Sequence, residues 1–147
     1  MATDSETRID DPELVKAEWL RRLDDLVEIV RGWAERAGWR TRRIVKSVSE
    51  RRLGRYEVPV LLMEKDTVEV VLNPVARLVP GAEGADDLYL SPAYDDIAAL
   101  YLEGGRWVVH YAETPDPDAA ESRAEFSPRP FEEATIRAIL DGMATDA

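Results

Sequence analysis

Cysteine is absent from the sequence, and histidine occurs once. The lack of cysteine excludes disulfide frameworks, thiolate nucleophiles, and zinc or iron–sulfur sites built on cysteine. His110 alone cannot supply a two-histidine metal site, and general-base chemistry would need an acid or a nucleophile within its reach. No serine stands in the G-x-S-x-G context of a nucleophile elbow. The sequence therefore favours a non-catalytic role, and we expect no cofactor.

Long hydrophobic runs are also missing. The longest, at 58–63 and 97–102, have six residues each, whereas about 20 are needed to span a bilayer. The first residues carry neither the basic region nor the apolar region of a secretory signal. We therefore expect a cytoplasmic protein with no membrane partner.

Basic residues are in the minority: 19 Lys and Arg stand against 30 Asp and Glu, which gives a net charge of −11. This balance argues against a dedicated nucleic-acid binder. Hydrophobic residues make up 45% of the 147 residues, which is enough for the core of one domain over 1–147. We expect 1–10 to be frayed and 113–130, which is rich in proline and acid, to be extended.

Helical signals stand at both ends of this domain. Asp11 and Pro12 are typical of a helix start, apolar residues follow at helical spacing, and Gly38 is a typical stop. These features predict a helix over 12–37. A second, short helix is predicted over about 131–141, with Gly142 as its stop.

The chain between the helices predicts strands. Candidates lie at 41–49, 56–63, 68–72 and 88–90, within a loop-rich stretch over 73–96. Gly104-Gly105 predicts a tight hairpin in which Glu103 opposes Arg106. A Lys65-Asp66 turn would place Met63 opposite Val68. The expected fold is α+β: a long N-terminal helix, a mostly antiparallel sheet of five or six strands, and a short C-terminal helix.

Positive charge is concentrated in one window. Residues 31–55 contain nine basic and two acidic side chains, so this window carries +7 and the rest of the chain −18. Guanidinium groups suit carboxylates and phosphates. The window is either an anion- or partner-binding band or a set of arginines paired with the chain's own carboxylates. The candidate binding residues are Arg36, Arg40, Arg42, Arg43, Lys46, Arg51, Arg52, Arg55, Trp33 and Trp39.

Three functional hypotheses remain open. We favour a non-catalytic protein-interaction module, of adaptor, chaperone-like or immunity type, whose partner is another protein or its own copy in a homodimer. The second is a small divalent-metal-dependent enzyme acting on a phosphorylated substrate, with Asp86, Asp87, Asp95, Asp96 and Glu103 around the ion. Adjacent aspartates point in different directions, so we assign no metal site. The third is a nucleic-acid-contacting subunit, for which only residues 31–55 are suitable.

Overall fold

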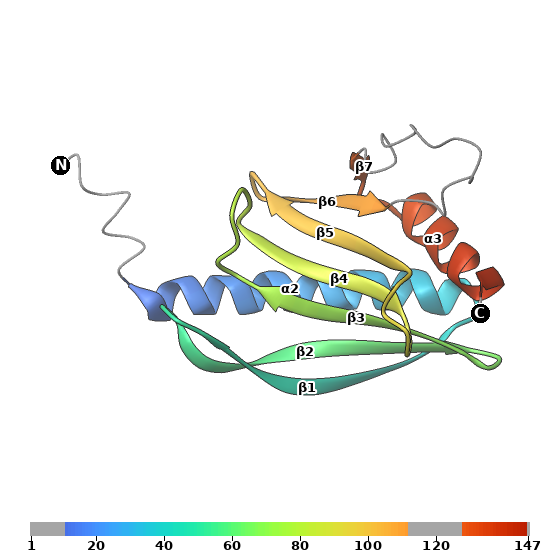
Figure 1. Cartoon of the computed structure of the whole chain (residues 1–147), viewed down its shortest axis with the longest axis horizontal. Helices are drawn as coiled ribbons and strands as arrows, with labels where there is room; N and C mark the ends of the chain where they lie inside the picture. The colour runs from blue at the N-terminus through green and yellow to red at the C-terminus, as the bar shows by residue number, and fades with distance from the viewer. Residues whose placement is uncertain (1–10, 112–127, 147) are drawn as a thin grey trace.

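The computed structural model describes residues 11–111 and 128–146. Two helices and one seven-stranded sheet make up this part of the chain (Figure 1). The expected α+β class is confirmed, with seven strands in place of five or six. The elements are α2 (Pro12–Arg36), β1 (Arg40–Glu50), β2 (Gly54–Lys65), β3 (Val68–Ala76), β4 (Gly84–Leu90), β5 (Ile97–Glu103), β6 (Arg106–Tyr111), β7 (Pro128–Pro130) and α3 (Glu133–Asp146).

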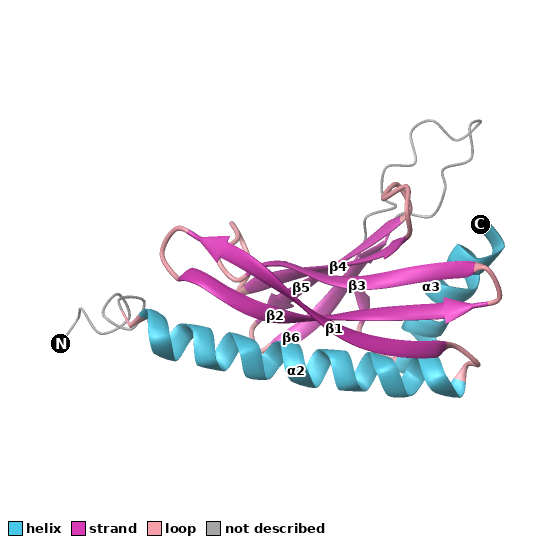
Figure 2. Cartoon of the chain, turned by 90° about the horizontal axis from the view of Figure 1, so that it is seen from below, coloured by secondary structure: helices cyan, strands magenta, loops and turns pink. Residues whose placement is uncertain are grey.

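The strands form an antiparallel meander, because every strand pairs with its neighbours in the chain. Its two edges are therefore β1 and β7. Helix α2 runs along one face of this sheet, as Figure 2 shows. Helix α3 contacts α2 and β3, so both helices cover the same face, as expected for an antiparallel sheet with one covered side.

Local sequence explains α2. The Asp11 side chain accepts the Leu14 N–H at 3.4 Å, and Pro12 occupies the first turn, where its missing N–H costs nothing. The chain then turns away at Gly38, whose φ is +92°. The predicted helix over 12–37 is confirmed to within one residue. Its apolar stripe packs on the sheet through Trp19, Leu23, Leu26, Val27, Val30 and Ala34.

The Gly104-Gly105 hairpin has the predicted register, with Glu103 opposite Arg106. The β2–β3 register was wrong by two residues: Met63 faces Val70, and Lys65 faces Val68 across a turn at Asp66 and Thr67. Asp66 has a φ of 56°, a conformation that aspartate adopts more readily than most residues. The slip of two residues keeps each side chain on its predicted face.

Proline explains where β2 leaves β3. The two strands pair only from Leu61↔Leu72 to Lys65↔Val68. Extending this register by two residues would place Pro59 opposite Pro74, and neither residue has an N–H to donate. The first seven residues of β2 therefore pair with β1 alone.

Two other predictions need correction. The strand candidate at 88–90 is confirmed, but the strand begins four residues earlier than predicted, because β4 spans 84–90. A Cβ on Gly84 would lie 2.4 Å from the Trp19 ring, so only glycine allows this strand to pass so close to α2. Gly142 does not end α3, which continues to Asp146 because buried Ile139, Leu140 and Met143 hold the helix on both sides of it. The regions 1–10 and 112–127 lie outside the described residues.

Candidate interaction surface

The basic residues of the 31–55 window fall into two groups, and the first is paired with the chain's own carboxylates. Arg36 of α2 bonds to Glu133 of α3, with its Nη2 3.1 Å from Oε1. Arg43 of β1 contacts both Asp24 and Glu28 of α2. These contacts fasten the helices to each other and to the sheet.

Two further cations of β1 have partners on neighbouring strands. Arg40 pairs with Glu64 of β2 at 3.1 Å. Lys46 donates from Nζ to Asn73 Oδ1 of β3 at 2.7 Å. Pairing with the chain's own carboxylates therefore describes three of the candidate cations, Arg36, Arg40 and Arg43, and an amide oxygen holds Lys46.

The tryptophans of the candidate set contribute to packing. Trp39 is 3% exposed and belongs to the main core. Trp33 is half-buried and stacks against Phe131, with ring centroids 5.0 Å apart. The structure therefore does not bring the two rings together with the exposed arginines on one surface.

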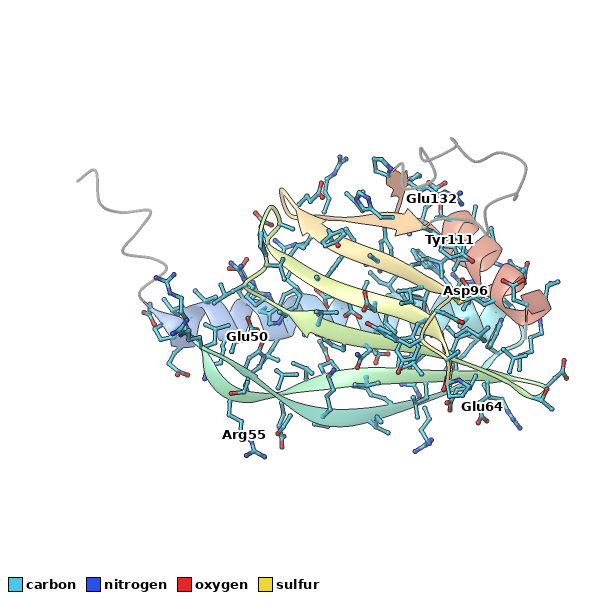
Figure 3. The ribbon with its side chains drawn as sticks, viewed as in Figure 1. Glu50, Arg55, Glu64, Asp96, Tyr111 and Glu132 are labelled. Atoms are coloured by element: carbon cyan, nitrogen blue, oxygen red, sulfur yellow. The ribbon has the colours of Figure 1, made fainter. Side chains whose placement is uncertain are left out.

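The second group of cations lies on the β1–β2 hairpin. Arg42, Arg51 and Arg52 are exposed and have no ion pair within the described ranges 11–111 and 128–146. Arg55 donates only to Ser47 Oγ, at 3.4 Å. Figure 3 shows the Arg55 side chain projecting outward from β2 near the β1–β2 turn. We call Arg42, Arg51, Arg52 and Arg55 the hairpin arginines.

A partly buried acid, Glu50, holds the turn of this hairpin in place. Glu50 accepts the backbone N–H groups of Arg77 and Leu78, each at 2.9 Å, and the hydroxyl of Tyr56. Burial, followed by the hydrogen bond to Glu50, raises the pKa of Tyr56. The Glu50 carboxylate thus ties the β1–β2 turn to the segment after β3, and the hairpin presents its arginines from a fixed position. No sequence pattern indicates this role of Glu50, because its partners Arg77 and Leu78 lie 27 and 28 residues away along the chain.

A polar cluster behind Lys46 was also missed. Burial lowers the pKa of Lys46, although the nearby charges of Asp86 and Asp87 act in the opposite direction. Burial, with the charge of Asp87 adding to it, raises the pKa of Asp86 far above its ordinary value. Asp86 is fully buried and its oxygens have no hydrogen-bond partner in the described part of the chain. Asp87 accepts the hydroxyl of Tyr94, and this hydrogen bond raises the pKa of Tyr94 to about 12.

The acidic residues of the metal hypothesis are dispersed. Asp86 and Asp87 lie within β4, Asp96 immediately precedes β5, and Glu103 is at the far end of β5. Asp96 is engaged with Tyr111, whose hydroxyl donates to it at 2.8 Å (Figure 3). Among the residues that the structure describes, no group of three or more histidine, aspartate or glutamate side chains could hold a metal ion.

His110, the single histidine of the sequence, lies on the sheet face opposite the helices. His110 contacts Tyr101 edge to face, with ring centroids 5.2 Å apart, which confirms that they share this face.

Over 11–111 and 128–146, neither helix combines the length and the apolar character that a membrane crossing needs.

No family model, no curated protein and no solved structure matches the chain.

Proposed function

We propose that the chain is a non-catalytic protein-interaction module that uses its β1–β2 hairpin to contact an acidic surface of a partner protein. The observation that carries this proposal is the division of the basic window. Arg36, Arg40 and Arg43 are neutralised by the chain's own carboxylates, whereas the hairpin arginines are exposed without an ionic partner among the described residues.

Three features support a protein as the partner. Arginine forms bidentate bonds to carboxylates and is enriched at the energetic centres of protein interfaces. The anchored turn holds several guanidinium groups in place before contact, which lowers the entropy lost on binding. A net charge of −11 repels nucleic acid at long range.

The experiment compares two triple variants with equal charge. Arg51, Arg52 and Arg55 are replaced by glutamine in the first variant, and Arg21, Arg106 and Arg137 in the second. All six side chains are exposed. Each tagged protein is used to capture partners from lysate of its own cells, with and without nuclease treatment. Its mass is measured by light scattering after size exclusion.

The amount of partner captured by the hairpin variant should be at least tenfold lower than with the wild type, and the control variant should capture as much as the wild type. Binding should weaken between 50 and 200 mM salt, because exposed ion pairs are screened. Equal capture by both variants would refute the hairpin as the contact surface. A wild-type protein that stays monomeric and captures nothing would refute the interaction module, and capture abolished by nuclease would support the nucleic-acid hypothesis instead.

A further inference from the structure

The structure assigns β1 a second role that rests on the proposed function: we propose that an extended, acid-rich segment of the partner adds to the free edge of β1 as an eighth strand. β1 pairs only with β2, and no described element lies along its other side (Figure 1). Its 11 residues pair with β2 in one unbroken register, without a bulge. Such an edge offers unpaired backbone groups to another chain.

The hydrogen-bond pattern of the sheet identifies which residues of β1 have backbone groups that an added strand can bond to. Ser91 N–H donates to the carbonyl of Glu69 at 2.9 Å, so the backbone groups of Glu69 point toward β4. Alternate residues point in opposite directions. Val70 and Leu72 therefore bond toward β2, and their partners Met63 and Leu61 bond toward β3.

The same alternation continues across β2. Leu61 directs its backbone N–H and C=O groups toward β3, and Pro59, two residues before it, directs its backbone the same way. The missing N–H of Pro59 therefore costs no hydrogen bond to β1. Even-numbered residues of β2 then bond to even-numbered residues of β1. The odd-numbered residues of β1 direct their N–H and C=O groups to the free edge: Thr41, Arg43, Val45, Ser47 and Ser49.

The side chains beside this edge select the occupant. On the face toward α2, Val45 is 60% exposed, and Arg43 is already matched by Asp24 and Glu28. On the opposite face lie exposed Arg42 and half-buried Lys46, whose ammonium group is directed to Asn73. An added strand therefore meets an apolar neighbour on one face and the guanidinium group of Arg42 on the other. The matching segment alternates apolar and acidic residues, with an apolar residue opposite Val45.

A second copy of β1 fits this edge less well. Two-fold pairing centred on Val45 would place Lys46 opposite Ile44 of the other copy and diagonal to its Arg42. The Arg42 and Lys46 side chains of both copies would then share one face of the pair. An acidic occupant places carboxylates there instead, so charge complementarity favours a segment of a different protein.

The probe is a nine-residue peptide of alternating valine and glutamate, acetylated and amidated, titrated into the isotope-labelled full chain and followed by amide NMR. In the proposed geometry, the valine N–H groups face β1 and the glutamate N–H groups face solvent. We expect saturable shifts in β1. N-methylation of the valines should weaken binding at least tenfold, and N-methylation of the glutamates should change it less than threefold.

Protein variants test the same edge from the other side. Val45→Pro removes an outward N–H without removing a bond to β2, and should weaken peptide binding at least tenfold. Val45→Thr keeps the N–H and should bind within about twofold of the wild type. Thermal unfolding verifies that both variants fold, and the methylated peptides keep the proposal testable if the proline variant does not.

The outcomes separate this inference from the proposed function. If capture of the cellular partner is lost in the variant of Arg51, Arg52 and Arg55 but retained by Val45→Pro, strand addition is overturned and the hairpin surface remains supported. Equal binding of both methylated peptides, no shifts with 1 mM peptide, or a dimer of the chain that Val45→Pro dissociates would each overturn the acidic occupant. If Val45→Pro loses the binding of both the peptide and the cellular partner, strand addition by an acidic segment is supported.

Discussion

The two edges of the sheet are built in opposite ways. β7 has three residues, two of them proline, so only Arg129 retains a backbone N–H there. β1 has 11 residues and no proline. Short edge strands and prolines protect a sheet against unwanted pairing, and so do charges. β7 is both short and rich in proline, whereas β1 is protected by charge alone. Most of that charge is already bound to side chains of other elements, since this holds for Arg40, Arg43 and Lys46.

The difference extends to how each edge is held. Trp19, Leu53 and Tyr56 form a cluster that joins the β1–β2 hairpin to the start of α2. Phe131, immediately after β7, packs against half-buried Trp33 near the end of α2. The open edge is therefore supported by a buried aromatic residue, and the protected edge by a partly exposed one.

Removing the two tryptophans gives the largest test of this comparison. Trp19→Ala should lower the free energy of unfolding by about 3–5 kcal/mol, because Trp19 is 1% exposed and its loss leaves a cavity against Gly84. Trp33→Ala should cost about half as much, since less surface is buried. Urea unfolding followed by far-UV circular dichroism measures both. Equal losses would show that the two edges are supported alike.

Glu50 provides the next largest effect. Glu50→Gln replaces one accepting oxygen by a donor facing the N–H groups of Arg77 and Leu78, so we expect a loss of about 1.5–3 kcal/mol. Hydrogen exchange of these two amides should accelerate. Glu57→Gln, on the exposed side of the same hairpin, is the control and should leave both measurements unchanged. Unchanged exchange in Glu50→Gln would mean that the carboxylate does not anchor the turn.

Asp86 predicts a pH dependence at the centre of the sheet, where Lys46 reaches in from β1. Burial raises the pKa of Asp86 in the folded chain above its ordinary value near 3.8, so the folded state binds this proton more tightly than the unfolded state. Its contribution to stability is complete below the unfolded value and is lost as pH rises through the folded pKa. Asp86→Asn should therefore exceed the wild type in stability at pH 8, by about 1 kcal/mol or more.

The pH range supplies the check on Asp86. The advantage of Asp86→Asn should grow from pH 4 upward, and exposed Asp95→Asn should follow the wild type throughout. Thermal melts across this range give the comparison. A constant difference between Asp86→Asn and the wild type would exclude titration of Asp86 as the cause.

The fold was predictable where local signals were unique. Gly104-Gly105 and the alternation on each side of it allow one register, and the prediction was correct. Around Asp66 both faces of the hairpin are apolar, so the period of two cannot choose between registers that differ by two residues. Of β4, only 88–90 were predicted, because Asp86 and Asp87 are poor strand formers. The close packing of Gly84 on Trp19 belongs to the part of the strand that the pattern did not predict.

The division of the arginines was not predictable for a similar reason. Arg42 and Arg43 are neighbours in sequence, but adjacent residues of a strand face opposite sides. Arg43 meets Asp24 and Glu28 because α2 crosses that side of β1. Pairing therefore depends on tertiary placement, which composition cannot provide, and the +7 of the window overstated the charge available to a partner.

These two arginines give the smallest and most specific test. Arg43→Gln should lower stability by about 0.5 kcal/mol, because it breaks two partly exposed ion pairs between β1 and α2. Arg42→Gln, one residue away, breaks none among the described contacts and should leave stability unchanged. The loss in Arg43→Gln should shrink in 1 M salt, where charges are screened within about 3 Å. Partner binding should respond in the reverse order, with Arg42→Gln the more damaging, because only the Arg42 guanidinium is free to meet an incoming carboxylate.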